Sequence, residues 1–481
     1  PYVSMATTQK MVDDDDFKVK ESVIRKMTRL AIHHNAVNLS QGFPNEGPPS
    51  EGVCEVICGL LGGTDEDKNE LKDKKVSDLM GSLIDPSQHQ NATLYDLLSA
   101  INERGRLNEI SQYSVPFGRP ALREKIASYY ERFYPGTKGA TRQRVDPDRN
   151  ITVTLGATES LVIILRTICK PGDSILIMEP FHELYPSQAA VLYLKPEFTE
   201  MKENITTNKW ELDFTDIEAK AKICKAMILC NPHNPTGKLF DTEELQQLCH
   251  ICLKHNMYLI TDDIYEHMIY SGATQEKHIL PGWDTESVLT SAAGFSDDEV
   301  QKMANLYIIM NSLSKTWSCT GWRLGWVICP SHLTENLRAV HDQMVLQAPT
   351  PIQVGAQALL DIPKEYYLKM TSKYQERRDF LVQELEKLGF ECTQPNSAYY
   401  AFMRFRNVPA LKGFSKPIDA SIFLLKEIGV ATVPGDNFYY NGHNTDYIRF
   451  CFCRQMPQLQ EAVKRLQKLQ EYNAETALKQ K

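Results

Sequence analysis

Short apolar runs alternate with helical patterns through the middle of this 481-residue chain. A repeat of strand, helix and strand predicts a mostly parallel sheet that helices cover on both faces. In such a sheet, ligands bind beyond the carboxyl ends of the strands. We expect strands at residues 151–155, 175–178, 226–230, 258–261, 306–310 and 324–328.

The pattern changes beyond about residue 340, where long helices and few strands predict a separate, smaller α+β domain. Between Gly62 and Arg106 the chain is dense in Asp, Glu, Lys and Ser, which favours a surface insertion. We therefore expect four parts: an N-terminal arm with part of the small domain at 1–60, the insertion at 61–110, the large domain at 111–340 and the C-terminal small domain at 341–481.

The formal net charge of -8 argues against nucleic acid or an anionic membrane as the main partner, because either would require a basic face. The sequence has neither an apolar run of about 18 residues nor a secretory signal pattern. We expect a cytoplasmic enzyme, with an organelle address left open, whose 12 cysteines are reduced thiols.

One segment offers a metal site as an alternative, because Cys249 and Cys252 have the C-x-x-C spacing of zinc ligands. No second such pair lies nearby to complete four ligands. The apolar spacing instead predicts one face of a core helix, opened by a capping box of Asp241 and Glu244. We therefore expect no metal.

The segment 312–325 follows the expected strand 306–310 and contains a lysine, Lys315, among hydroxyls and glycines. Alone, such a lysine is more often an exposed cation than a nucleophile. Its neighbours favour chemistry, because Arg323 offers a fork suited to a phosphate and Ser312 offers a hydroxyl.

Three further strand ends carry polar or small residues. Asn234 lies in a proline-fixed turn, Asp262 and Tyr265 follow the strand 258–261, and the turn 156–158 (Gly156, Ala157, Thr158) opens a helix whose N-terminus suits phosphate. Each segment alone could be a turn or a helix cap. Together they supply the nucleophile, carboxylate, phenol, amide and phosphate cradle that pyridoxal phosphate (PLP) requires.

Four segments, SLSKTWSCTGWRLGW, NPHNPTG, DDIY and YIRF, resemble the class I and II aminotransferases of PLP fold type I in order and spacing over about residues 35–475. The runs LSQGFPN, TPIQ and FCFCR resemble the kynurenine and glutamine aminotransferase branch less specifically. The resemblance implies an α/β fold with a mostly parallel central sheet in a large PLP-binding domain, plus a smaller α+β domain.

The resemblance also implies roles for the catalytic residues. Lys315 would hold PLP as a Schiff base and move a proton between the substrate Cα and the cofactor. Asp262 would pair with the pyridine N–H and keep the ring an electron sink. Tyr265 and Asn234 would hydrogen-bond the ring oxygen.

By the same resemblance, Arg323, Ser312 and the turn 156–158 would hold the phosphate, with Tyr113 reaching across from a neighbouring subunit of a homodimer. Arg449 would grip the substrate α-carboxylate in a two-bond fork, assisted by the Gly42 backbone and Asn234. The structural alternatives are an ordinary buried tyrosine at Tyr113 and a surface salt bridge at Arg449.

This chain departs from the family pattern in at least two places, and the insertion from Gly62 to about Arg106 is also longer than the family pattern leads us to expect. His182 stands where the family stacks an aromatic ring on the cofactor, and an alignment that places Phe181 there stays open. Ser397 stands where the family commonly has glycine, so we expect a different loop backbone there.

We therefore predict a PLP-dependent aminotransferase that moves an amino group from an amino acid of aromatic, kynurenine, methionine or glutamine type to a 2-oxo acid, through pyridoxamine phosphate. A β- or γ-elimination lyase, such as a cysteine-S-conjugate β-lyase, is the alternative with the same cofactor. A non-catalytic PLP-binding regulator is disfavoured because too few residues precede Asn38 to form a DNA-binding module. A nicotinamide dehydrogenase is disfavoured because no G-x-G-x-x-G follows a strand.

Overall fold

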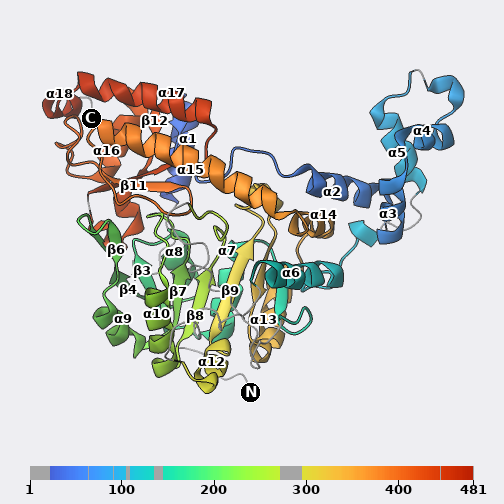
Figure 1. Ribbon diagram of the computed structural model, residues 1–481, viewed down its shortest axis with the longest axis horizontal. Coiled ribbons are helices and arrows are strands. Elements are labelled where there is room, and N and C mark those ends of the chain that lie inside the picture. Colours follow the sequence, from blue (N-terminus) through green and yellow to red (C-terminus); the bar gives the residue numbers. More distant parts are fainter. Residues whose placement is uncertain are drawn as a thin grey trace, which may run out of the picture.

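The computed structural model describes residues 22–62, 64–89, 91–104, 109–134, 145–270, 295–444 and 446–479. Its centre is one seven-stranded sheet that contains all six expected strands (Figure 1). Every strand is parallel to the others except β10, which pairs antiparallel with both of its neighbours. The order is β2 (Ile151–Thr154), β10 (Gly325–Ile328), β9 (Tyr307–Ser312), β8 (Tyr258–Asp262), β7 (Cys224–Cys230), β3 (Ser174–Glu179) and β4 (Lys195–Glu200).

Helices cover both faces of this sheet, as the near-continuous apolar strands predict. Side chains alternate between the two layers, so that in β3 Ile175 and Ile177 pack on one side while Leu176 and Met178 pack on the other. The first layer contains α7 (Ala157–Ile168), α8 (Leu184–Val191) and α13 (Ser331–Val345). The second contains α6 (Pro120–Phe133), α9 (Phe214–Ala221), α10 (Thr242–His255), α12 (Asp297–Ala304) and α14 (Thr350–Leu360).

The predicted core helix around Cys249 is confirmed as α10. Asp241 and Glu244 form the capping box, and Cys249 and Cys252 are buried on the apolar face beside Leu245 and Leu248. Burial raises the pKa of the Cys249 thiol to about 12, so this thiol stays protonated. Within the described residues no group of His, Cys, Asp and Glu side chains has an arrangement that could hold a metal ion.

A second, smaller layer combines both ends of the chain. A three-stranded antiparallel sheet of β11 (Tyr400–Arg404), β14 (Tyr447–Cys451) and β13 (Val433–Pro434) lies beside the long helix α15 (Lys364–Lys387). The N-terminal strand β1 (Val37–Asn38) pairs in parallel with β12 (Val430–Ala431). The remaining elements of this region are α1 (Val23–His33), α16 (Pro417–Phe423), α17 (Met456–Leu466) and α18 (Ala474–Leu478). A short ribbon of β5 (Lys202–Asn204) and β6 (Lys209–Glu211) follows β4.

The polar segment after Gly62 forms helices that project from one end of the molecule (Figure 1). Helix α2 (Ser50–Gly62) packs against α14, and Gly355 permits this because a Cβ there would lie 2.8 Å from the Gly52 carbonyl oxygen. The projection then continues through α3 (Asp65–Asp73), α4 (Val76–Leu83) and α5 (Leu94–Arg104). The four-part division of the chain stays a prediction. Within the part of the chain that is described, no helix is long and apolar enough to cross a membrane.

The projection has its own small core of Leu79, Ile84, Leu97 and Ile101, separate from the two large clusters. We therefore predict that Leu97→Ala lowers the free energy of unfolding of the projection by about 2–5 kcal/mol, the usual loss for a buried leucine. The stability of the central sheet should not change. Hydrogen exchange measured peptide by peptide should accelerate in residues 64–104 only. Ile177→Ala, in β3, is the matched control and should lower the stability of the whole sheet. Faster exchange of sheet amides in Leu97→Ala would contradict an independently stable projection.

Candidate active site

A cavity of about 440 Å³ opens at the carboxyl ends of β7, β8 and β9, between the large sheet and the smaller layer. The sequence-predicted residues come together in its wall, although they lie as far apart in the chain as Gly42 and Arg449. Predicted residues that line it are Gly42, Ala157, Thr158, His182, Asn234, Asp262, Tyr265, Ser312, Lys315, Arg323 and Arg449.

Lys315 follows β9, and its Nζ donates a hydrogen bond to the Gly42 carbonyl oxygen at 2.9 Å. Desolvation by the surrounding protein lowers the pKa of Lys315 to about 8, against the opposing influence of Cys453 and Asp262. Arg323 and Arg449 lower the same pKa further by charge repulsion. A substantial fraction of the amine is therefore neutral near physiological pH, which is the form that acts as a nucleophile or base.

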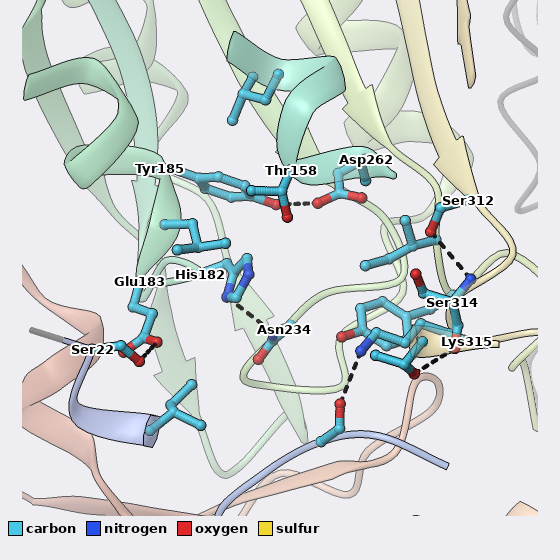
Figure 2. A pocket seen from close by; sticks show the side chains of 18 of the residues that line it. Ser22, Thr158, His182, Glu183, Tyr185, Asn234, Asp262, Ser312, Ser314 and Lys315 are labelled. Atoms are coloured by element: carbon cyan, nitrogen blue, oxygen red, sulfur yellow. Dashed lines mark hydrogen bonds between the residues drawn. The ribbon is translucent and has the colours of Figure 1, made fainter. Parts of the chain in front are cut away.

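Asp262 ends β8 and is only 3% exposed. Its Oδ2 accepts a hydrogen bond from the Tyr185 hydroxyl at 2.7 Å (Figure 2), whereas its buried Oδ1 has no hydrogen-bond partner. Burial raises the pKa of Asp262 to about 6, and the Tyr185 hydroxyl opposes that rise. A buried carboxylate oxygen without a partner is costly, so this atom is suited to an N–H or cationic donor from a bound molecule.

Arg449 of β14 is fully surrounded by protein. Its two terminal nitrogens each donate at 2.8 Å, Nη1 to the Asn234 side-chain oxygen and Nη2 to the Ser40 carbonyl oxygen. The guanidinium lies 4.3 Å from the centre of the Tyr400 ring, and its Nε is buried without a partner. These contacts hold a planar cation at the cavity wall, where it could bind a carboxylate.

His182, and not Phe181, is the residue that the structure places in the cavity wall. Phe181 packs in the core with its ring 5.5 Å from that of Phe198. The Asn234 amide nitrogen lies 3.4 Å from His182 Nδ1, as Figure 2 shows. Burial and the nearby charges of Arg449 and Lys315 lower the pKa of His182 to about 3, so its ring is a neutral aromatic surface at physiological pH.

Another part of the cavity wall is formed by Ala157, Thr158, Ser312 and Arg323. Arg323 donates to the Leu155 carbonyl oxygen at 3.2 Å and to the Thr320 carbonyl oxygen at 3.1 Å. Gly156 has a φ of +83°, and a Cβ there would lie 2.9 Å from the Arg323 guanidinium, so a side chain is excluded. Because Gly156 cannot cap α7 with a side chain, the helix N-terminus beside Ser312 and Arg323 is suited to an anion.

Two predicted residues do not line the cavity. Gly156 lies against the Arg323 guanidinium, and Tyr113 is 80% exposed. The reach of Tyr113 into a neighbouring subunit stays a prediction. Ser397 replaces the expected glycine without strain at its own φ, because the positive φ of +54° falls on Ala398. The Ser397 hydroxyl donates to the Gly237 carbonyl oxygen at 3.0 Å and thereby holds the loop.

Sequence reasoning missed several lining residues. Tyr185 holds Asp262, and the Tyr400 hydroxyl lies 2.9 Å from the Tyr265 hydroxyl. Ser22 and Arg25 come from the N-terminal end of α1. No local pattern marks Tyr185, Ser22 or Arg25, because the contacts that bring them to the cavity join segments far apart in the sequence. The run Tyr399–Tyr400 beside the noted Ser397 was the one available signal.

Comparison with known proteins gives the same family as the motifs. The family model described as aminotransferase class I and II matches residues 82–466. Kynurenine–oxoglutarate transaminase 1 of Homo sapiens is 27% identical over 92% of this chain and 94% of that protein. Kynurenine–oxoglutarate transaminase of Dictyostelium discoideum is 27% identical over 93% of this chain and 94% of that protein.

A solved structure has the same fold. N-succinyldiaminopimelate aminotransferase from Mycobacterium tuberculosis superposes with a TM-score of 0.73 at 24% identity, over 94% of this chain and 98% of that one. The predicted fold type I architecture is therefore confirmed. The match of the family model over most of the chain shows that this protein is an enzyme of the class I and II aminotransferase family, whose members are PLP-dependent transaminases.

Proposed function

We propose that this enzyme transfers the amino group of a kynurenine-type or other aromatic amino acid to a 2-oxo acid, with PLP bound in the cavity around Lys315. The observation that carries the cofactor assignment is the buried, unpartnered Oδ1 of Asp262, a residue that lines the same cavity as Lys315. The relatives named kynurenine–oxoglutarate transaminases support the substrate class.

The cavity residues fit the parts of PLP. Asp262 would accept the ring N–H, Tyr265 and Asn234 would face the ring oxygen, and His182 would lie against the ring. The phosphate would lie between Arg323, Ser312 and the N-terminus of α7, with Tyr113 of a neighbouring subunit completing this end in a homodimer. When bound, PLP would supply the carbonyl that takes up the amino group and an electron sink for the substrate Cα.

The remaining residues orient the substrate and move its proton. Arg449 would hold the α-carboxylate in a two-bond fork beside the Gly42 backbone and Asn234. The neutral Lys315 amine would take the proton from the substrate Cα, because it lies at the same wall and its pKa is lowered to about 8. The smaller layer contributes Tyr400 and Arg449 to the same cavity wall.

The direct test is the separation of the two half-reactions. Adding an aromatic amino acid alone to the holoenzyme should convert the bound cofactor to its amino form, and adding a 2-oxo acid should reverse the change in absorbance. A bound cofactor that never cycles would refute the proposal. Steady release of pyruvate and ammonia from a cysteine conjugate, without cycling, would favour the elimination lyase.

We predict that Lys315→Ala still binds PLP weakly through the phosphate end of the cavity but loses about 10²- to 10⁴-fold in turnover, the usual contribution of a positioned base. Single-turnover absorbance with the amino acid measures this loss. The control is Lys302→Ala, an exposed lysine of α12, which should retain wild-type rates. Retained turnover in Lys315→Ala would contradict its role.

The pKa of Lys315 predicts how cofactor loading depends on pH. Below about pH 8 the amine is protonated and cannot attack a carbonyl, so the rate of PLP incorporation into apoenzyme should fall roughly tenfold for each pH unit well below 8. Above that pH the rate should level off. Stopped-flow absorbance from pH 6 to 10 would measure the profile. A rise that continues to the ordinary lysine pKa of 10.5 would contradict a lowered value.

Arg449→Lys should raise KM for both the amino acid and the 2-oxo acid about 10- to 100-fold, because an ammonium cannot form the two-bond fork. The absorbance of the bound cofactor should not change. Arg404→Lys, on the adjacent strand β11 and outside the cavity, is the matched control. Equal KM values in Arg449→Lys and wild type would contradict carboxylate binding at this position.

A further inference from the structure

We infer that His341 of α13 and Glu159 of α7 are positioning residues for the phosphate end of the cavity. Both are buried, and neither lines the cavity itself. Their contacts fix the turn 156–158 and the segment 113–118 relative to each other, so that an anion meets a preformed site. The inference rests on the proposed function, because it takes the phosphate of the cofactor as that anion.

His341 is fully buried, and both nitrogens of its ring face oxygen acceptors. Nδ1 lies 2.6 Å from Glu159 Oε1, and Nε2 lies 3.0 Å from the Pro116 carbonyl oxygen. A ring that donates from both nitrogens carries a positive charge. The Glu159 carboxylate supplies the partner that such a buried charge requires.

Glu159 connects this histidine to the start of α7. Its Oε1 accepts from His341, and its Oε2 accepts at 2.5 Å from the backbone N–H of Leu155, the residue directly before the turn 156–158. The carbonyl oxygen of Leu155 accepts from Arg323 Nη2 at 3.2 Å. A continuous series of hydrogen bonds therefore leads from the histidine to the arginine that would hold the phosphate.

The other ring nitrogen of His341 holds the segment that contains Tyr113. Pro116 accepts from this nitrogen, and the carbonyl oxygen of the next residue, Phe117, accepts from the Val153 N–H of β2 at 3.0 Å. The segment 113–118 is thus fixed both to the sheet and to α13. Because one imidazole ring contacts this segment and Glu159 together, a change at His341 affects both parts of the phosphate end.

The charge of Glu159 gives a second reason for the histidine. Glu159 lies in the first turn of α7, directly after Thr158, which lines the cavity (Figure 2). The N-terminal end of a helix favours an anion, but a carboxylate without a counterion at this place would repel a phosphate. The His341 cation cancels that charge. Removing His341 therefore takes away the support of the turn and leaves an uncompensated negative charge beside the anion site.

The experiment compares PLP with pyridoxal, which has the same ring and aldehyde but no phosphate. Full-length enzyme is dialysed to equilibrium against each compound, and the bound aldehyde is measured by its absorbance. The ratio of the two dissociation constants isolates the contribution of the phosphate. It is measured in wild type, His341→Ala, Glu159→Ala, Glu159→Gln and Leu337→Ala. Leu337 is the matched control, because it lies one turn before His341 in α13 and is equally buried but apolar.

We expect the preference for PLP over pyridoxal to fall about 10- to 100-fold in His341→Ala, the usual loss for hydrogen bonds to a charged group. Glu159→Ala should lose less, because no carboxylate then remains beside the phosphate. Glu159→Gln should keep most of the preference, because its amide can accept from Leu155 and donate to the neutral form of the His341 ring. Leu337→Ala should lower the melting temperature and keep the wild-type ratio.

Unchanged ratios in His341→Ala and Glu159→Ala would overturn the inference. An equal loss of affinity for PLP and pyridoxal would also overturn it, because it would indicate a general role in stability. A fall in Leu337→Ala as large as that in His341→Ala would do the same.

Each of these results would leave the proposed function intact, since wild type would still bind PLP more tightly than pyridoxal. If wild type bound the two compounds equally, the phosphate would not lie between Arg323, Ser312 and the N-terminus of α7. The proposed position of the cofactor would then fail, and this inference with it.

Discussion

Burial of both faces of the parallel sheet is the constraint on which the rest of this structure depends. Because α7, α8 and α13 cover one face and α6, α9, α10, α12 and α14 the other, the strand interiors are mostly apolar. The polar side chains that can meet a bound molecule therefore lie mainly where strands end. Asp262, Lys315 and the turn before α7 lie at such ends, and the smaller layer adds Arg449 from above. The position of the cavity therefore follows from the helices that cover both faces of the sheet.

Several polar groups in the cavity wall are desolvated or lack hydrogen-bond partners within the protein. Asp262 Oδ1 and Arg449 Nε are buried without partners, and Lys315 is surrounded so closely that its pKa drops to about 8. Each of these arrangements costs folding free energy. A bound molecule that supplies the missing donor or acceptor offsets this cost. The same groups therefore lower the free energy of unfolding of the protein alone and raise its affinity for that molecule.

Sequence patterns predicted the sheet well, because β-branched runs mark buried strands directly. They missed β4, where the polar run Lys195–Glu200 lies at the edge of the sheet and needs less apolar surface. They also could not give the antiparallel direction of β10. Of the motif residues in the cavity wall, Asp262, Ser312 and Lys315 could be predicted because they lie at or just after a strand end, whereas Arg449 lies within β14 and was predicted from the family resemblance. Tyr185, Tyr400 and Arg25 were missed because their contacts depend on packing between distant segments, which local spacing does not encode. The helices after Gly62 were missed because their apolar faces are small.

The pairing of β1 with β12 has a consequence for how this enzyme forms. Val37 meets Val430 across almost the whole length of the chain, and the Gly42 carbonyl that contacts Lys315 follows directly after that strand. Closing so long a loop is entropically costly and slow compared with forming local helices. During synthesis the large sheet can assemble while the segment around Gly42 still has no strand to pair with. Lys315 thus gains its full surroundings only after most of the polypeptide has left the ribosome, and chains that end before β12 lack part of the cavity wall.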